Sequence, residues 1–164
     1  MGSRILFVRI TFATAIATTL LASAAAASTM PRFGSIVKDG DFSFRPTQVK
    51  CNIARVGQSF EVVRATGQFC RVKIWIYNHS KSSQFIDVTS QFAVDKKGRK
   101  FPGSIEADTA GNPNVQGGFG MDLMTLNPGL SVTGYLYFDM PKGDVPTYFI
   151  FHDSAFSGGA DERA

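Results

Sequence analysis

The segment GQFCRVKIWIYN, residues 67–78, most constrains the fold of this chain. Within it, aliphatic side chains alternate with amphipathic ones: Val72, Ile74 and Ile76 against Lys73, Trp75 and Tyr77. Successive side chains on a β-strand point to opposite faces, so this alternation predicts a strand with one face in a core. We expect Trp75, the only tryptophan, to pack against its neighbours rather than to act as an exposed ligand platform.

Other apolar stretches of strand length recur along the chain with turn signals between them. Strand-like stretches follow at 85–94, 131–138 and 147–151, and an earlier one near Phe42–Val49 is interrupted by Pro46, which favours an edge strand or a bulge there. Turns are expected at Asp39-Gly40, at the hairpin 95–100 and at Pro128-Gly129. A helical turn near 105–109 is the only helix expected after residue 27. The sequence therefore predicts an all-β immunoglobulin-like sandwich of about seven strands.

The N-terminus has the pattern of a cleaved signal peptide, residues 1–27. Arg4 and Arg9 flank a basic start, an uncharged stretch follows, and small residues lead to a cut after Ala27, with Ala24 as the alternative. The apolar stretch is shorter than the roughly 20 residues that a membrane span needs, so no stable span is expected after cleavage. We divide the rest into a flexible lead-in (28–38), the sandwich (39–157) and a polar C-terminal tail (158–164).

Signal cleavage also changes the charge. It removes Arg4 and Arg9, which lowers the formal net charge from +4 to +2. The basic segment at 95–100 has no interleaved aromatic residues, which single-strand binders need. No nucleic-acid partner is therefore predicted.

Cys51 and Cys70 are the only cysteines. An even, small number of cysteines in an exported chain favours a disulfide between them. The alternatives are two free buried thiols, or one thiol used in chemistry.

His152, Asp153 and Ser154 are the three residue types of a serine-hydrolase triad, but they are consecutive. On an extended chain Asp153 points away from its two neighbours, so the base cannot contact both nucleophile and acid. We expect Asp153 and Ser154 to cap a turn instead. No catalytic residue is predicted.

A copper site is the second chemical possibility, because imidazole and thioether groups suit that metal. The available residues are His79, His152, Met121, Met124 and Met140. Methionines more often fill gaps in cores and loops, so no metal ligand and no cofactor is predicted. Asn78-His79-Ser80 also matches the short glycosylation sequon.

Several pieces, in order, resemble one known family. They are DGDFSF (39–44), Cys51, the segment 67–78, DKKGRKF (95–101), LNPG (126–129), TGYLYFDMPKG (133–143) and HDSAFSGG (152–159). Together they resemble the bacterial secreted immunoglobulin-like domains of unknown function, a group that includes the actinobacterial immunoprotective extracellular antigens. The resemblance implies a sandwich of about seven strands, export and no established enzymatic activity. It departs at the end, where ADERA replaces a β-branched final strand, and this predicts an open sheet edge.

These observations favour a secreted, non-enzymatic protein that acts through extracellular or cell-envelope contacts. Its partner would be an unidentified extracellular or envelope protein, contacted through the Gly/Asn-rich loop 110–120 or the C-terminal edge. The alternative is an envelope carrier of a ligand or of copper on the same scaffold.

Overall fold

The structure is a computed structural model that describes residues 30–58, 62–112 and 124–164. The predicted signal peptide lies outside these ranges, so the structure does not test it. Within them, no helix is both long enough and apolar enough to cross a membrane.

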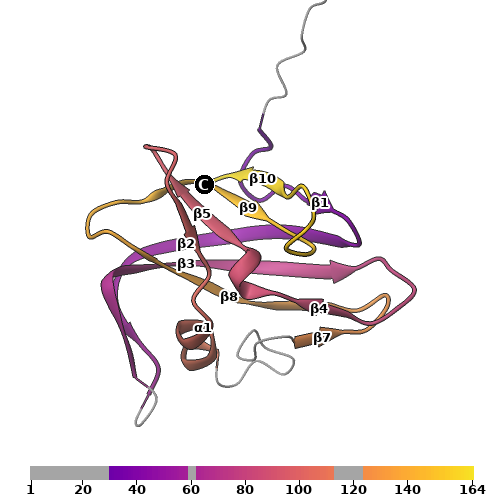
Figure 1. Cartoon of the computed structure of the whole chain (residues 1–164), viewed down its shortest axis with the longest axis horizontal. Helices are drawn as coiled ribbons and strands as arrows, with labels where there is room; N and C mark the ends of the chain where they lie inside the picture. Colours follow the sequence, from indigo (N-terminus) through magenta and orange to yellow (C-terminus); the bar gives the residue numbers. More distant parts are fainter. Residues whose placement is uncertain (1–29, 59–61, 113–123) are drawn as a thin grey trace, which may run out of the picture.

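Two four-stranded antiparallel sheets dominate the fold (Figure 1). The first sheet, in spatial order, contains β1 (Val37–Asp39), β2 (Phe42–Val56), β3 (Val63–Asn78) and β8 (Ser131–Met140). The second contains β10 (Ala160–Arg163), β9 (Pro146–Phe151), β5 (Phe92–Asp95) and β6 (Lys100–Pro102). A small two-stranded sheet pairs β4 (Gln84–Ile86) with β7 (Met124–Leu126), and two short helices complete the fold, η1 (Val88–Ser90) and α1 (Ile105–Gly111).

Aromatic side chains from both sheets form the centre of the core. Phe44 of β2 stacks on Phe151 of β9 with ring centroids 5.4 Å apart, and Phe138 of β8 lies 5.6 Å from Phe149 of β9. All four rings are fully buried. Their packing joins the two sheets face to face, which confirms the predicted all-β sandwich.

The strand predicted at 67–78 is the C-terminal part of β3, between β2 and β8. Val72, Ile74 and Ile76 are fully buried, as the alternation predicts. Trp75 lies on the opposite, outer face and is partly buried. It packs on Tyr77, with ring centroids 5.8 Å apart and planes 16° from parallel.

Among the described residues, eight strands form the two main sheets, in line with the expected sandwich of about seven strands, and two more form the small sheet. Two boundaries predicted from the sequence are wrong. The lead-in expected to extend to residue 38 is structured: Phe33 packs on the core and β1 begins at Val37. The tail expected at 158–164 contains β10, which pairs with β9 from Ala160 to Arg163.

The C-terminal strand β10 is polar, and Glu162 is its one fully buried residue. The backbone N–H groups of Gly34 and Ser35 act to favour its charged form, although neither carboxylate oxygen has a hydrogen-bond partner among the described residues. Burial has the larger effect and raises the pKa of Glu162. In addition, the Arg163 backbone N–H donates to Pro31 O. The sheet edge predicted to be open at β9 is therefore covered by β10, and the segment before β1 contacts β10 in turn.

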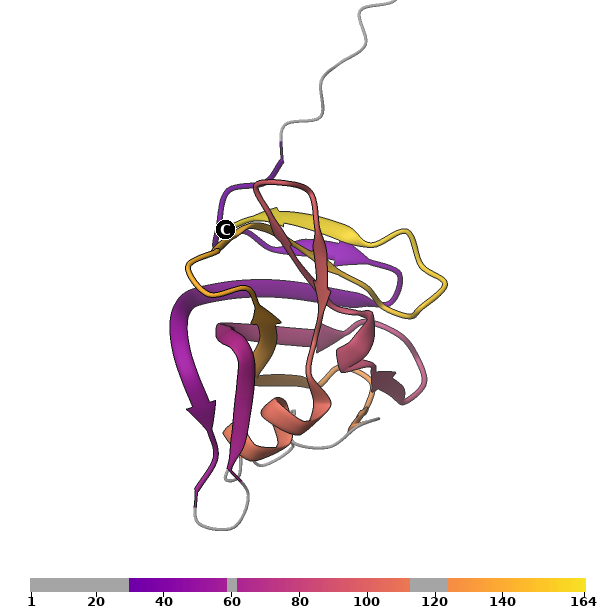
Figure 2. The same cartoon turned by 60° about the vertical axis from the view of Figure 1, so that its left-hand side comes forward.

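The β2–β3 hairpin has two parts of different character. In the inner half, residues 42–49 pair with 72–78, and the only irregularity is a register shift after Pro46, as that proline predicts. In the distal half, residues 50–56 pair with 63–71 through two further shifts, and Asn52 adopts a left-handed backbone conformation with φ of 63°. The strands bend here and turn away from the sandwich toward α1 (Figure 2).

The predicted disulfide joins Cys51 to Cys70 in this distal half, with their Cα atoms 4.0 Å apart. Cys70 is fully buried. The bond therefore ties β2 to β3 at the point where strand pairing becomes irregular.

The helical turn predicted near 105–109 is α1, and it covers the free edge of β8. Ser104 caps the helix: its Oγ accepts a hydrogen bond from the Ala107 backbone N–H. Asp108 Oδ1 accepts from the Tyr137 backbone N–H at 2.6 Å, and the Asn112 side chain bonds both the N–H and the carbonyl of Tyr135. Helical side chains thus replace the strand that this edge lacks.

Candidate functional site

The three triad-type residues at the end of β9 bond to different partners. His152 Nδ1 lies 3.2 Å from Ser157 O, and its ring packs edge-on against Phe92. Ser154 is exposed, and its Oγ accepts from the Phe156 backbone N–H at 3.4 Å. His152 and Ser154 therefore do not form the hydrogen bond between base and nucleophile that nucleophilic catalysis requires.

Asp153 instead ties the end of β9 to the β1–β2 turn. Its Oδ2 accepts from the Asp41 backbone N–H at 3.1 Å, and its own backbone N–H donates to Asp39 Oδ2 at 2.8 Å. Gly40 sits at the tip of this turn with φ of 52°, and a Cβ there would collide with the Asp153 carboxylate. The sequence predicts that Asp153 caps the tight turn after its own strand. Its side chain caps the β1–β2 turn instead, while Ser154 caps the turn after β9.

Two serine–histidine pairs meet among the described residues, and sequence reasoning missed both. His152 Nδ1 lies 3.3 Å from Ser157 Oγ, and His79 contacts Ser43 more closely. Ser43 Oγ lies 2.6 Å from His79 Nε2, while the His79 ring packs edge-on against Tyr77. A catalytic pair also needs an acid that orients the base. No carboxylate within the described ranges bonds the His79 ring, and Ser43 is buried. The pairing of Ser43 with Tyr77 across β2 and β3 is the signal that could have placed the two residues together.

The residues considered for copper are dispersed among separate contacts. Met140 is buried in the core, and the two histidines contact the groups described above. Met121 and the side chain of Met124 lie outside the described residues. Over the described part of the chain, no group of three or more His, Cys, Asp or Glu residues could hold a metal ion.

Asn78 of the glycosylation sequon has a structural role. The residue is fully buried, and its Nδ2 donates to Ser82 O at 2.9 Å and to Leu126 O at 2.8 Å. Because this nitrogen is the acceptor of a glycan, the folded domain does not present it for modification.

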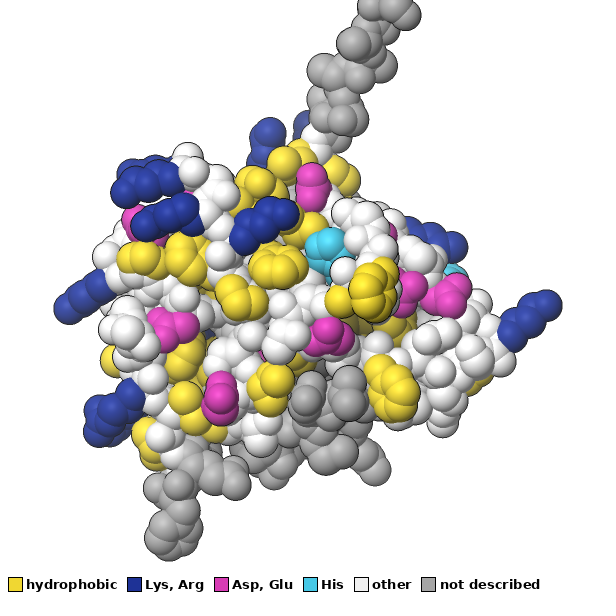
Figure 3. Space-filling model, in the orientation of Figure 1, with side chains coloured by type: hydrophobic (Ala, Val, Ile, Leu, Met, Phe, Trp, Pro, Cys, Tyr) yellow, Lys and Arg dark blue, Asp and Glu magenta, His cyan; other side chains and the backbone are white. Residues whose placement is uncertain are grey.

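Positive side chains gather over the β5–β6 hairpin, where they form a visible group (Figure 3). Arg99 bridges Asp95 and Asp144 through Nη2, at 2.6 and 2.5 Å. Burial acts to raise the pKa of Asp95, but hydrogen bonds from the Arg99 backbone and side chain hold it below its usual value. Asp95 of the hairpin and Asp144 between β8 and β9 therefore neutralise part of the positive charge here, which favours a solvated turn over a phosphate site.

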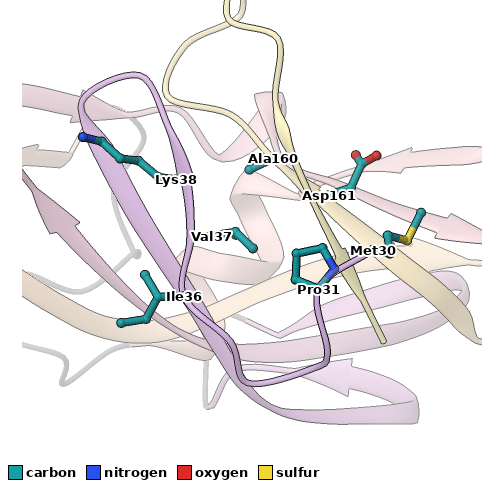
Figure 4. A pocket seen from close by; sticks show the side chains of 7 residues that line it. All are labelled: Met30, Pro31, Ile36, Val37, Lys38, Ala160 and Asp161. Atoms are coloured by element: carbon teal, nitrogen blue, oxygen red, sulfur yellow. The ribbon is translucent and has the colours of Figure 1, made fainter. Parts of the chain in front are cut away.

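A groove of about 430 Å³ lies between β1 and β10, the two strands at one side of the sandwich (Figure 4). Met30, Pro31 and Ile36 supply its apolar lining, and Lys38 and Asp161 supply opposite charges. Ile36 is 58% exposed. Its described lining residues form no set of converging polar groups that would orient a small ligand.

An aromatic row runs along the outer face of β3 and consists of Trp75 and Tyr77, with Arg45 beside it. The Arg45 guanidinium lies 5.4 Å from the centroid of the Trp75 ring. Both aromatic residues are only partly buried, and Arg45 is exposed. The row is mounted on the regular, inner half of the hairpin, so its geometry is fixed by the sheet.

Of the two contact surfaces predicted from the sequence, the loop 110–120 is described only to Asn112. Ala110 is buried, and Asn112 is bonded to β8, so these first residues serve the fold. The C-terminal edge is occupied by β10, as described above.

The fold defines a class of small β-sandwich proteins. The chain is similar to MPT63, a secreted protein from Mycobacterium tuberculosis, with a TM-score of 0.59 and 17% identity over 85% of this chain and 100% of that one. It is also similar to the yjhA protein from Bacillus subtilis, with a TM-score of 0.52 and 18% identity over 74% of this chain and 81% of that one. At these identities the likeness concerns the fold.

Sequence assigns the family. Residues 31–162 match the family described as Domain of unknown function (DUF4352), and the chain belongs to it. No curated protein matches the chain by sequence. The match spans both sheets, from the segment before β1 into β10.

Proposed function

We propose that this domain is exported and acts outside the cytoplasm as a non-enzymatic binding module for an envelope or extracellular protein. The N-terminal signal pattern and the disulfide support export, because disulfides persist in oxidising compartments. The placement of His152, Asp153 and Ser154 in separate structural contacts supports a role other than catalysis.

The single observation that carries the binding role is the aromatic row of Trp75 and Tyr77 with Arg45. Tryptophan, tyrosine and arginine are the side chains that most often supply the binding energy of protein interfaces. Here they lie on a rigid sheet face and retain exposed surface. A preformed row of this kind loses little side-chain entropy on association.

Photo-crosslinking in the producing cells tests this proposal. A crosslinking residue at Thr133, the β8 partner of Trp75, should give a discrete protein adduct, and the same residue at Lys96 of the β5–β6 hairpin should not. Trp75→Ala should remove the adduct, while Phe156→Ala, which removes a side chain that is 99% exposed, should leave it unchanged. Adducts that form equally from both positions would refute a specific surface.

Export is tested separately on protein recovered from the culture supernatant. Intact mass should correspond to a chain that starts at Ser28 and has lost two hydrogens to the disulfide. A chain retained in the cytoplasm with free thiols would contradict the location.

A further inference from the structure

A second candidate binding site lies in the distal half of the hairpin, beyond the aromatic row. A pocket of about 280 Å³ lies between the distal half of the β2–β3 hairpin and α1. Figure 2 shows these two elements side by side, with the bent strands turning down toward the helix. The strand bend and the helix together therefore create a concave surface that a flat sheet lacks.

The polar lining of this pocket is strongly cationic. Lys50, Arg55 and Arg71 all line it, and its described lining residues include no acidic side chain. Lys50 and Arg71 are also directly opposite one another in the β2–β3 pairing. Like charges at opposed positions destabilise a sheet. Salt bridges among the described residues involve only Arg99, so no carboxylate of that part of the chain neutralises the three cations.

Arg71 is held in place from one side. Its guanidinium lies 4.4 Å from the centroid of the Tyr135 ring, a cation–π arrangement that fixes its plane. Its Nε is buried and has no hydrogen-bond partner in the described part of the chain. A buried donor without an acceptor costs free energy that a bound acceptor would recover.

Tyr137 adds a neutral donor. Burial raises the pKa of its phenol, although the Arg71 guanidinium acts in the opposite direction, so the hydroxyl keeps its proton at neutral pH. Gly111 permits the close approach of α1, because a Cβ there would lie 2.5 Å from the Tyr137 ring. Ile53 and Val56 supply apolar surface next to the cations.

We propose that this pocket binds a phosphate group, with Arg55, Arg71 and Lys50 neutralising its charge and Tyr137 donating a hydrogen bond. Three cations exceed what a single carboxylate requires and suit an oxyanion that carries up to two charges. The apolar side of the pocket accommodates the carbon skeleton to which the phosphate is attached. The group comes either from a soluble phosphomonoester or from a lipid headgroup.

Calorimetric titration of the folded, oxidised protein tests the site with glycerol 3-phosphate as the probe and glycerol as the uncharged comparison. Saturable binding of the phosphate alone is expected. Arg71→Gln and Arg55→Gln should each weaken it about tenfold or more, since a hydrogen bond between charged groups contributes roughly 1.5–3 kcal/mol. Arg32→Gln removes the same charge from the exposed segment before β1, outside the pocket, and should change the affinity less than twofold.

Two further results separate the site from general charge attraction. Without the probe, Lys50→Gln should unfold at higher urea concentration than the wild type, because it relieves the opposed like charges, yet it should lose binding. Flotation with phosphatidylglycerol vesicles, compared with phosphatidylcholine vesicles, distinguishes a lipid source from a soluble one. The proposal is overturned if glycerol 3-phosphate does not bind, or if Arg32→Gln weakens binding as much as Arg71→Gln does. Neither result depends on Trp75, so the proposed protein interface stands or fails separately.

Discussion

The inner and distal halves of the β2–β3 hairpin belong to the same two strands but differ in almost every physical respect. The inner half is regular, and its inward side chains are apolar and buried between the sheets. The distal half is bent, stapled by a disulfide, and carries three cations around a pocket. In the inner half, apolar side chains are buried in the core, which stabilises the fold. The distal half places like charges, Lys50 and Arg71, at directly opposed positions, which destabilises a sheet. Such departures from local consistency are typical of functional sites.

The largest predicted effect is in the inner half. Phe44→Ala removes a fully buried ring that bridges the two sheets by stacking on Phe151. The free energy of unfolding should fall by about 3–5 kcal/mol, the usual cost of deleting a core aromatic ring. Urea denaturation followed by tryptophan fluorescence measures it. A loss below about 1 kcal/mol would show that the inner half does not organise the core.

The disulfide tests whether the distal half depends on its own staple. Replacing Cys51 and Cys70 with alanine should lower the free energy of unfolding by roughly 3 kcal/mol for this sequence separation of 19. Hydrogen exchange should then accelerate in residues 50–56 and 63–71 while residues 72–78 stay protected. Equal acceleration in both halves would remove the distinction between them.

Asp108 supports the β8 edge next to the distal pocket, and its burial predicts a pH effect. Burial raises the pKa of Asp108 well above its usual 3.8, although the Tyr137 backbone N–H partly opposes this. The folded protein therefore binds this proton more tightly than the unfolded chain does. The resulting stabilisation is present below pH 3.8 and is lost as pH rises through the folded pKa.

Asp108→Asn should retain the acceptor for Tyr137 and remove the titration. As pH rises above 4, the free energy of unfolding of Asp108→Asn should increase relative to that of the wild type, by on the order of 1 kcal/mol for a buried polar group. Urea midpoints measured from pH 4 to 8 test this. Glu162→Gln is a parallel test at a second buried carboxyl, whose pKa burial also raises. Parallel wild-type and Asp108→Asn curves would show that Asp108 does not titrate in this range.

The triad-type residues lie outside both halves, and the smallest expected effect is that of Ser154. Ser154→Ala should change the free energy of unfolding by less than about 0.5 kcal/mol, because the side chain is exposed. Asp153→Ala should cost about 1–2 kcal/mol, since it removes the acceptor of the Asp41 N–H at the β1–β2 turn. Loss of a clear wild-type esterase activity in Ser154→Ala would contradict the structural role assigned here.

Much of the inner half could be predicted from sequence, because its periodicity reports directly on burial. The alternation at 72–77 located β3 and its buried face, and Pro46 located the first irregularity of β2. The cysteine count located the disulfide. These signals are local: each depends on residues that are close together along the chain or on export chemistry.

The remaining features depend on contacts between distant segments. The polar sequence of β10 looks like a tail until Gly34 and Ser35 are placed beside Glu162. Lys50, Arg55 and Arg71 look like ordinary solvated charges until the strand bend and α1 enclose them. The Ser43–His79 contact likewise requires the register of β2 on β3. Composition and residue spacing do not predict contacts between segments that are far apart in the sequence.

The most direct test of the division between the two halves is a ¹⁵N NMR titration of the oxidised domain with glycerol 3-phosphate. The account predicts saturable shifts confined to the amides of residues 50–56, Arg71, Gly111 and Tyr137, with residues 42–49 and 72–78 unchanged. Shifts centred on the β5–β6 hairpin, or no shifts at all, would show that the charges of the distal half do not form a site.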